Sequence, residues 1–465
     1  MLVSFTVANF RSIGEPVTLS MVASRRCGGH ESHLVPIPGT DRSVLRVAVL
    51  YGANASGKSN LVRAMQYAQE RIDSTAPSLP GPPDRFRFDD AFIDQPSVFE
   101  FRFIAGDRVF TYGMDLRESQ VVGEWLTVLD GAEDFVVFER DAEGRVVLAP
   151  ESRLSVLADH RLARCLAHVA DAPLRTDQLA LRRVIELPAD FIGATLHGVT
   201  AWLRQGMVVA QPWTGGYDWL RRAETEPRVR EFAEAFLQRI DTGIEQMRLS
   251  VEERDRDEWA GPRPEVRAVF GRGGVDLGGG LVLPGEFREV RSVPGALSRV
   301  VDRRLLSIRT VGGRERELDV SEESDGTRQL LRFLPMIAGA GGNGSTHIVD
   351  ELDGSLHPAI CREFLRTFAE SCPDSHRQLI VTTHEAHLLD TDLLRRDEYW
   401  MVEKDRGHQT RLVSLSDFDV PDDFPLRRGY LQGRFGGVPR LRPEGRVLDA
   451  LNREGAELEG VAHAP

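Results

Sequence analysis

Apolar and polar residues alternate along this chain in blocks whose period changes from two to three or four, and then back to two. Residues 1–25 have period two on either side of a turn at Gly14–Pro16, which predicts two strands. From Ser97 to about Leu148 the same period continues through five runs separated by short turns. This pattern predicts an antiparallel meander.

The middle of the chain has a helical period. In residues 151–245 apolar side chains recur at spacings of three and four, in short blocks interrupted by Pro173 and Pro188. Long coiled-coil arms need many uninterrupted heptads, so these blocks predict a compact helical insertion instead. From about Ile244 to Val320 strand-like runs return, separated by glycine-rich loops such as residues 271–280.

A glycine-rich motif lies between a strand-like run and a helix-like one. The stretch Val47–Asn60 reads VAVLYGANASGKSN and contains GxxxxGK[ST], the pattern of a phosphate-binding loop. Its backbone N–H groups and the following helix N-terminus favour an anion. Lys58 is expected to reach the β- and γ-phosphates of ATP, and the Ser59 hydroxyl to coordinate Mg²⁺. The nucleotide-binding residues predicted in this loop are Gly52, Asn54, Ala55, Ser56, Gly57, Lys58, Ser59 and Asn60.

A second acidic motif follows a later apolar run. Thr346–Pro358 reads THIVDELDGSLHP, which has the form of a Walker B strand ending in two carboxylates. Asp350 is expected to hold Mg²⁺ through water, and Glu351 to orient the water that attacks the γ-phosphate. Downstream, QLIVTTHEAHLLD predicts a strand with His384 at its end, where the imidazole could sense the γ-phosphate as a switch.

Composition is typical of a globular protein without a membrane segment. The 465 residues are 41% hydrophobic and 28% charged, enough for a large core in two or three units. Neither a membrane-spanning run nor a signal peptide is evident, and four widely separated cysteines fit a reducing cytosol, so a cytoplasmic protein is expected. The net charge of −13 argues against a surface devoted to nucleic acid. Only two lysines occur, Lys58 and Lys404, and one occupies the motif position that needs a compact ammonium.

The segment from Cys27 to His33 offers one sulfur and two imidazole donors. A tetrahedral zinc site needs four ligands, or three and a water molecule, and the sequence has no second cluster to complete this one. We therefore interpret the segment as a polar loop.

With these motifs, the sequence resembles the ABC-type ATPases of bacterial anti-phage defence, the abortive-infection group that includes RloA-like proteins and the AriA subunit of PARIS systems. The resemblance covers most of the chain outside residues 151–300. It rests on NFRSI, GANASGKSN, PSVFEFRF, ESDGT, VDELDGSLHP, VTTHEAHLLD, RRDEYWMVEKD and YLQGRFGGVP.

The resemblance implies an α/β fold: a P-loop NTPase of the ABC-ATPase head type, with an antiparallel β subdomain and a compact helical insertion. It implies that ATP is held between two heads, with Ser324 and Gly326 acting across the dimer, and that Asp353 belongs to the loop after Walker B. In RecF-like and SMC-like heads an arginine at the position of Arg11 can lie beside the phosphates. The glutamine that many such ATPases use as a metal ligand stays unplaced, since Gln66 and Gln95 are poor candidates.

The expected domain plan has four parts. They are an N-terminal ATPase lobe at 1–150, a helical insertion at 151–245, a C-terminal ATPase lobe at 246–415 and a tail at 416–465. By resemblance, the leading hypothesis is an ATP-hydrolysing sensor or scaffold that responds to a phage protein or DNA. It would assemble as a head-to-head homodimer or higher homo-oligomer and control a separate toxic effector, a Toprim nuclease.

Alternative functions stay open at this point. A RecF-like DNA repair ATPase would show strong, salt-dependent DNA binding without a partner. An ATP-locked platform would show negligible turnover. A fused nuclease is disfavoured because only about eighty residues follow the switch strand, fewer than the ~100 of a typical domain. A transporter ATPase is the least favoured reading, since no membrane partner is implied.

Overall fold

The structure of the chain is a computed structural model. It describes residues 1–73, 80–131, 133–171, 173–210, 219–220, 225–260, 281–282, 287–293, 296–339, 344–370, 376–421 and 424–438. The glycine-rich loop at 271–280, Cys372 and the part of the expected tail after residue 438 lie outside the described residues.

A six-stranded sheet forms the centre of the molecule. Its order is β11 (Met207–Ala210), β17 (Thr346–Val349), β18 (Gln378–Thr383), β5 (Val47–Tyr51), β19 (Tyr399–Lys404) and β20 (Thr410–Ser414). All neighbouring pairs are parallel except β19 with β20. Strands of a parallel sheet are buried on both faces, so their sequences are continuous apolar runs. The buried VAVLY of β5 has this pattern.

The two faces of this sheet border different hydrophobic cores. Along β5, Ala48 and Leu50 point into one core, whereas Val47, Val49 and Tyr51 point into the other. Successive strand residues face opposite sides, so one short strand anchors both halves of the molecule.

A seven-stranded antiparallel sheet packs with the first core. Its order is β10 (Val146–Leu148), β9 (Glu133–Arg140), β8 (Gln120–Asp130), β7 (Arg108–Arg117), β6 (Ser97–Ala105), β1 (Leu2–Ala8) and β2 (Val17–Ser20). Helix α1 (Lys58–Ile72) contributes Leu61, Met65 and Ile72 to the same core. The two N-terminal strands and the meander are confirmed, and a small hairpin of β3 (Leu34–Pro36) and β4 (Ser43–Leu45) is added.

The helices of 151–245 divide between the two cores. Among the described residues of this segment, the helices are α2 (Glu151–Leu154), α3 (His160–Ala170), α4 (Ala180–Ile185), α5 (Ala194–Gln205) and α7 (Pro227–Arg239). Trp202 of α5 stacks on Phe103 of β6 at 4.2 Å between ring centroids, which ties α5 to the antiparallel sheet. In contrast, Phe236 and Leu237 of α7 belong to the second core.

Strand β11 was not predicted. It lies within the segment expected to be helical, where the apolar run MVVA is only four residues long. A run this short has no measurable period. It becomes a strand because its backbone completes the ladder beside β17, with Ala210 opposite Val349.

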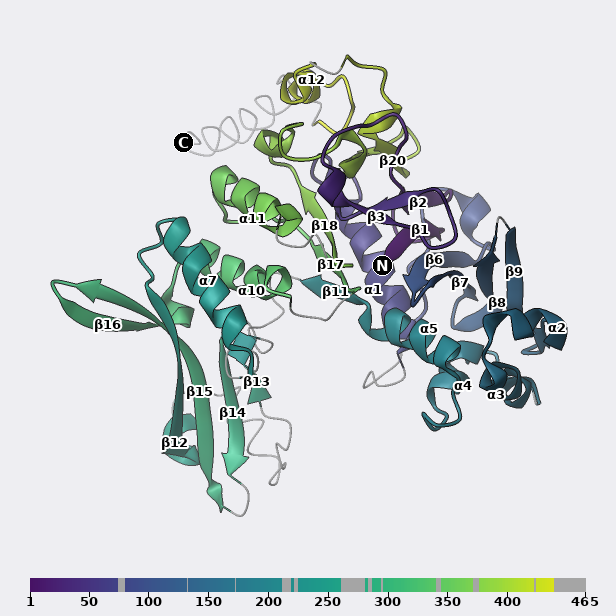
Figure 1. Cartoon of the computed structure of the whole chain (residues 1–465), viewed down its shortest axis with the longest axis horizontal. Coiled ribbons are helices and arrows are strands. Elements are labelled where there is room, and N and C mark those ends of the chain that lie inside the picture. Colours follow the sequence, from purple (N-terminus) through teal and green to yellow (C-terminus); the bar gives the residue numbers. More distant parts are fainter. Residues whose placement is uncertain are drawn as a thin grey trace, which may run out of the picture.

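A second antiparallel sheet projects from the molecule as an arm, at the lower left of Figure 1. Its elements are β12 (Gln246–Asp255), α8 (Arg256–Ala260), β13 (Leu281–Val282), β14 (Arg288–Val293), β15 (Ala296–Val311) and β16 (Arg314–Asp319). Buried ion pairs join neighbouring strands: Arg288 Nε lies 2.8 Å from Asp302 Oδ1, and Arg303 Nη1 lies 2.9 Å from Glu289 Oε2. Opposite charges across strands stabilise this narrow sheet.

Three helices complete the second core. They are α10 (Asp325–Ile337), α11 (Pro358–Glu370) and α12 (Leu426–Leu431). Within the described residues, no helix is both long and apolar enough to cross a membrane. The predicted α/β class, with an antiparallel sheet beside the P-loop sheet, is confirmed.

Asp115 on β7 carries an unfavourable charge in this fold. Its Oδ1 atom is buried and, among the described residues, has no hydrogen-bond partner. Burial, assisted by the charge of Glu100, raises the Asp115 pKa from 3.8 to about 6. The native state therefore binds more protons than the unfolded state in this range, and stability is lost as the pH rises through it.

We predict that Asp115→Asn raises the free energy of unfolding by about 1 kcal/mol at neutral pH, because the amide needs no ionisation. Thermal denaturation across pH measures this, with Asp130→Asn on the exposed end of β8 as the control. The gain should grow between pH 3.8 and about 6 and then stay constant. A gain that does not change with pH would contradict the assignment.

Candidate functional site

The phosphate-binding loop connects β5 to α1 at the carboxyl edge of the central sheet. Ala55 and Gly57 have φ values of 64° and 113°, in the left-handed region. A side chain at Gly57 would collide with the Thr410 hydroxyl, and one at Gly52 with the Val402 carbonyl and Ser56. Both motif glycines are therefore required by close contacts, and Gly57 is required by its backbone conformation as well.

Lys58, the first residue of α1, is buried with its ammonium inside the loop. Its Nζ donates to the Gly52 carbonyl at 2.6 Å and to the Ala53 carbonyl at 3.3 Å. Burial lowers the Lys58 pKa, while the carboxylates of Asp353, Asp350 and Glu351 act in the opposite direction. The cation thus faces three acidic side chains from the segment after β17, which fits a site that brings phosphates and a metal ion together.

Ser59, Asp350 and Thr382 form a connected group. The Ser59 hydroxyl donates to Asp350 Oδ1 at 3.2 Å, and the Thr382 hydroxyl donates to the same oxygen at 2.5 Å. One hydroxyl and one carboxylate suit Mg²⁺, which keeps several water molecules and takes few protein ligands when phosphates complete its shell. The residues present therefore fit the expected ion.

Glu351 follows Asp350 in a strained conformation. Its φ is 59°, and its side chain is exposed. The backbone holds it there, because its N–H donates to the Thr382 hydroxyl at 2.8 Å and its carbonyl accepts from Gln329 Nε2 at 3.2 Å. A positive φ in a non-glycine residue is costly and is characteristic of functional positions.

Asp353 and His384 meet beside the lysine. His384 Nδ1 lies 3.1 Å from Asp353 Oδ2, and the backbone N–H of His384 donates to the same oxygen at 3.2 Å. The Asp353 side chain is 6% exposed, whereas that of His384 is 60% exposed. Asp353 Oδ1 is buried without a partner among the described residues. An imidazole held at one end by a carboxylate is oriented for a ligand at its other end.

Ser324 and Gly326 lie at the N-terminus of α10. The Ser324 hydroxyl caps the helix by accepting from the Thr327 N–H at 3.2 Å, and Ser324 is exposed. A Cβ atom at Gly326 would lie 2.5 Å from the Ser355 carbonyl, so this glycine permits close packing against the loop that follows Walker B. The exposed helix terminus presents free N–H groups outward.

Arg11 makes contacts at the margin of the site. Its Nη2 lies 3.2 Å from Asp84 Oδ2, and its guanidinium lies 5.7 Å from the centre of the Phe10 ring. Its φ of 52° places it in the tight turn after β1. Its predicted contact with phosphate stays a prediction.

A network of side-chain hydroxyls that the sequence did not predict contacts the phosphate loop at Ser56 and Asn60. Asn60 Nδ2 donates to the Ser12 hydroxyl at 2.7 Å, which lies 2.8 Å from the Thr410 hydroxyl, and this hydroxyl donates to the Ser56 carbonyl at 3.0 Å. Ser12 and Thr410 are 398 positions apart. Nothing in the sequence connects them, and they meet in the folded chain, where the Thr410 N–H donates to the Ser12 carbonyl at 2.8 Å.

Thr382 was also missed, although the sequence contained a usable signal. It lies on the strand that leads to His384, and a hydroxyl beside an expected carboxylate is a common supporting group. Asn54 and Ala55 lie exposed on the loop, and the Ser56 hydroxyl is buried without a partner among the described residues.

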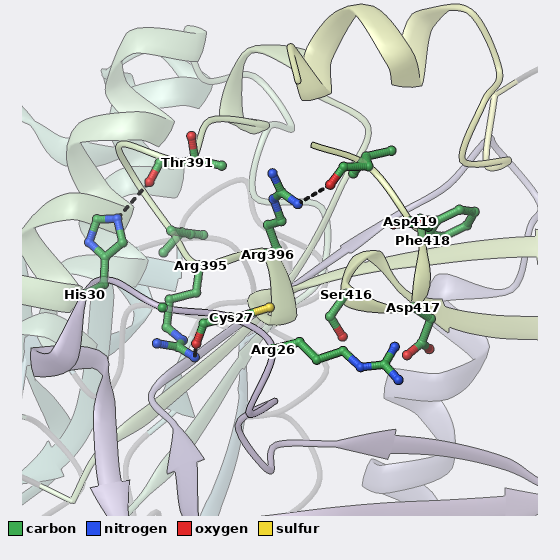
Figure 2. A pocket seen from close by; sticks show the side chains of 13 residues that line it. Arg26, Cys27, His30, Thr391, Arg395, Arg396, Ser416, Asp417, Phe418 and Asp419 are labelled. Atoms are coloured by element: carbon green, nitrogen blue, oxygen red, sulfur yellow. Dashed lines mark hydrogen bonds between the residues drawn. The ribbon is translucent and has the colours of Figure 1, made fainter. Parts of the chain in front are cut away.

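The candidate metal loop has other partners. As Figure 2 shows, Cys27 and His30 line a cavity of about 670 Å³ whose other walls come from residues near Arg395 and Asp417. His30 Nε2 lies 2.8 Å from the Thr391 carbonyl. The buried His33 contacts Glu398 at 3.0 Å, and Arg395 donates to the Cys27 carbonyl at 2.7 Å. These contacts join the segment to residues 391–398, which directly precede β19.

The glutamine position stays open. Gln66 contacts Glu70 on the exposed side of α1, and Gln95 donates to the Ala91 carbonyl. Neither contact involves the phosphate loop or Asp350, so both remain poor candidates.

Comparison with known proteins identifies a family. The family described as "AAA domain, putative AbiEii toxin, Type IV TA system" matches residues 47–390, which include the phosphate loop, Walker B and His384. No curated protein matches the chain at a significant level.

Similar solved structures include three SMC heads. An SMC head bound to the C-winged helix domain of ScpA is 13% identical, with 89% of this chain and 97% of that chain covered and a TM-score of 0.40. The SMC head domain from Thermotoga maritima is 14% identical, with 90% and 99% covered and a TM-score of 0.35. An Smc head with an extended coiled coil, bound to the C-terminal domain of ScpA from Pyrococcus furiosus, is 13% identical, with 90% and 97% covered and a TM-score of 0.38.

We predict that Thr382→Val lowers Mg²⁺-dependent phosphate release from ATP by about 10- to 100-fold, because Asp350 loses one of its two hydroxyl donors and the Glu351 N–H loses its acceptor. ATP binding without Mg²⁺ should change little. Thr383→Val is the matched control, since that buried hydroxyl accepts from Glu385 N–H at 3.0 Å and supports a different turn. Equal losses in both variants, or none in Thr382→Val, would contradict the role.

Proposed function

This chain belongs to the family described as "AAA domain, putative AbiEii toxin, Type IV TA system". On that premise we propose that it is an ABC-type ATPase, which hydrolyses ATP between two copies of itself to control a separate effector. The observation that carries the proposal is the convergence of Lys58, Ser59, Asp350 and the Asp353–His384 pair at one edge of the central sheet. These groups supply a phosphate-binding cation, a metal-binding pair and a γ-phosphate sensor at one place.

Each residue has a distinct task in this proposal. Lys58 exchanges its bonds with the Gly52 and Ala53 carbonyls for bonds with phosphate oxygens. Ser59 and Asp350 would hold Mg²⁺, which would neutralise charge on the phosphates. Glu351, held by Thr382 and Gln329, orients the attacking water and accepts its proton.

The exposed N-terminus of α10 supports action across a dimer. Ser324 is exposed, and helix N–H groups with the positive end of the dipole favour a phosphate from a partner. Gly326 packs on the carbonyl of Ser355, in the loop that contains Asp353. Because Asp353 accepts from the His384 N–H, closure of the dimer at α10 would shift His384 of the same chain. The triphosphate would then act as the bond between two copies.

The effector part of the proposal rests on resemblance. The matching family carries a toxin–antitoxin description, and the motifs of this chain resemble those of anti-phage defence ATPases. We propose that a phage protein or DNA changes the ATP-dependent closure of the heads and thereby releases a separate Toprim-type nuclease. Co-purification of the neighbouring gene product with and without ATP tests this step independently of ATP hydrolysis.

We predict that Glu351→Gln lowers phosphate release by about 100- to 1,000-fold while ATP binding is kept, because an amide cannot accept the proton. The closed dimer should accumulate with ATP and Mg²⁺, as measured by light scattering. Equal rates for the native chain and the variant would remove Glu351 from the reaction and favour a platform without turnover.

A mixing experiment tests the shared site. Lys58→Ala and Ser324→Arg should each lack hydrolysis alone. When mixed in equal amounts, half of the dimers are mixed and carry one intact site, so roughly a quarter of the native rate is expected if sites act independently. Absence of any recovery, with mixed dimers verified by differently tagged copies, would contradict action of Ser324 across the interface.

A further inference from the structure

A groove of about 410 Å³ lies on the outer side of α12, the helix at the top of Figure 1. It is lined by Pro425, Arg427, Arg428, Leu431 and Gln432, and its walls are chiefly apolar. The exposed fraction of Leu431 is 57%, so a large apolar side chain stays in contact with water. Another molecule that covers this side chain would gain the stabilisation that its exposure gives up.

The rim of this groove is positively charged. Arg427 and Arg428 are exposed, and neither has an ion pair among the described residues. The chain as a whole has a net charge of −13, and exposed arginines elsewhere pair with carboxylates, as Arg248 does with Glu315 at 3.2 Å. Two unpaired arginines beside an exposed leucine therefore suit a ligand that combines carboxylates with an apolar side chain.

The segment that carries the groove is fixed on its inner side. Tyr430 is buried, and the turn after α12 closes at Gly433, whose φ is 76° and whose N–H donates to the Tyr430 carbonyl at 2.8 Å. Phe435 is buried and contacts Phe418 edge-on, with 5.2 Å between ring centroids. Leu431 is therefore held outward on a well-packed support.

The same segment contacts the phosphate loop directly. A Cβ atom at Gly437 would lie 3.5 Å from Gly52 Cα, so the backbone of Gly437 packs against the first glycine of the loop. The Tyr430 hydroxyl donates to the Gly437 carbonyl at 3.3 Å, and the Tyr430 ring meets the Tyr51 ring edge-on, with 5.6 Å between centroids. A displacement of the backbone at Gly52 therefore acts on a segment that includes α12.

Helix α12 also packs against the short helix at 386–388, which begins two residues after His384. In the proposed function a nucleotide takes Lys58 from the Gly52 carbonyl, and His384 senses the γ-phosphate. Both changes occur beside residues that the groove segment contacts. A ligand that binds one arrangement of these contacts more tightly than another shifts the equilibrium between them.

We propose that this groove is the docking surface for an acidic segment of a protein partner, whose apolar side chain packs on Leu431, and that the partner is the separate effector. This inference rests on the proposed function. Nucleotide in the Lys58 loop changes the affinity of the groove, and by thermodynamic linkage the bound segment changes the affinity for nucleotide by the same factor. Coupling of this kind typically amounts to roughly 5- to 150-fold.

The probe is the labelled peptide acetyl-EELEELEE, compared with acetyl-KKLKKLKK and acetyl-EEAEEAEE by fluorescence anisotropy at low salt. The first peptide should bind, and the other two should bind roughly 10-fold more weakly or not at all, because they lack the charge or the apolar anchor. Arg427→Glu combined with Arg428→Glu should lower the affinity for the first peptide by roughly 10- to 30-fold, and Leu431→Ala by roughly 5- to 10-fold.

Matched controls come from the arm. Arg314→Glu combined with Arg316→Glu changes the net charge equally at two exposed positions of β16, and Val311→Ala truncates another exposed apolar side chain. These variants should bind acetyl-EELEELEE as the native chain does. The groove variants should release phosphate from ATP at the native rate, because the groove residues supply no group to the phosphate loop.

Coupling is measured with Mg²⁺ and the hydrolysis-resistant β,γ-imido analogue of ATP. Saturation with the analogue should change the affinity for acetyl-EELEELEE by roughly 5-fold or more, and the peptide should change the affinity for the analogue by the same factor. Tyr430→Phe removes the hydroxyl that holds Gly437. It should bring this factor toward one and leave peptide binding without nucleotide unchanged.

Four results would overturn the proposal. They are absent or equal binding of the acidic peptide across the groove variants, a coupling factor of one, loss of the ATP-dependent dimer in the groove variants, and tighter peptide binding by Glu457→Lys combined with Glu459→Lys. The third result would assign the groove to a second copy, and the fourth to the acidic end of the same chain. If the native chain hydrolyses ATP while the groove is refuted, the proposed function stands. If it does not hydrolyse ATP, both fall.

Discussion

The parallel pairing of β17, β18 and β5 is the constraint on which the candidate site depends. It places the carboxyl ends of three strands at one edge, and the residue after each strand then has a fixed neighbour. Asp350 follows β17, His384 follows β18 and the phosphate loop follows β5. A shift of one residue in either pairing would turn Thr382 away from Asp350 and remove the 2.5 Å contact between them.

At this edge of the sheet, burial and the neighbouring carboxylates act on the Lys58 charge in opposite directions. One buried ammonium faces Asp350, Glu351 and Asp353, and burial lowers its pKa while these carboxylates support its charge. An anionic ligand would give the Lys58 ammonium a new partner, and a divalent cation would do the same for the carboxylates. The unpaired Asp353 Oδ1 and the strained Glu351 backbone show that the chain holds polar groups here in costly states. Such costs are characteristic of sites arranged for a ligand.

The sequence predicted the parts of this site that are local in the chain. The strand, loop and helix around Lys58 lie within one continuous stretch, and the same holds for Asp350 with Glu351 and for the strand before His384. It did not predict Ser12 with Thr410, because a contact across 398 positions has no local pattern. Nor did it predict β11, whose four residues are too few to show a period and whose structure comes from its neighbour β17. The helices of 151–245 were visible by period, but their division between two cores depends on tertiary packing.

The use of arginine for nearly every positive charge has a chemical consequence. Of the two lysines, Lys58 is buried in the phosphate loop and Lys404 is exposed at the end of β19. Acylating reagents that attack primary amines, and enzymes that modify or cleave at lysine, therefore find one accessible side-chain amine beside the hairpin. The guanidinium groups that cover the remaining surface stay protonated and resist such reagents. A single fluorophore could be attached at that position without engineering the chain.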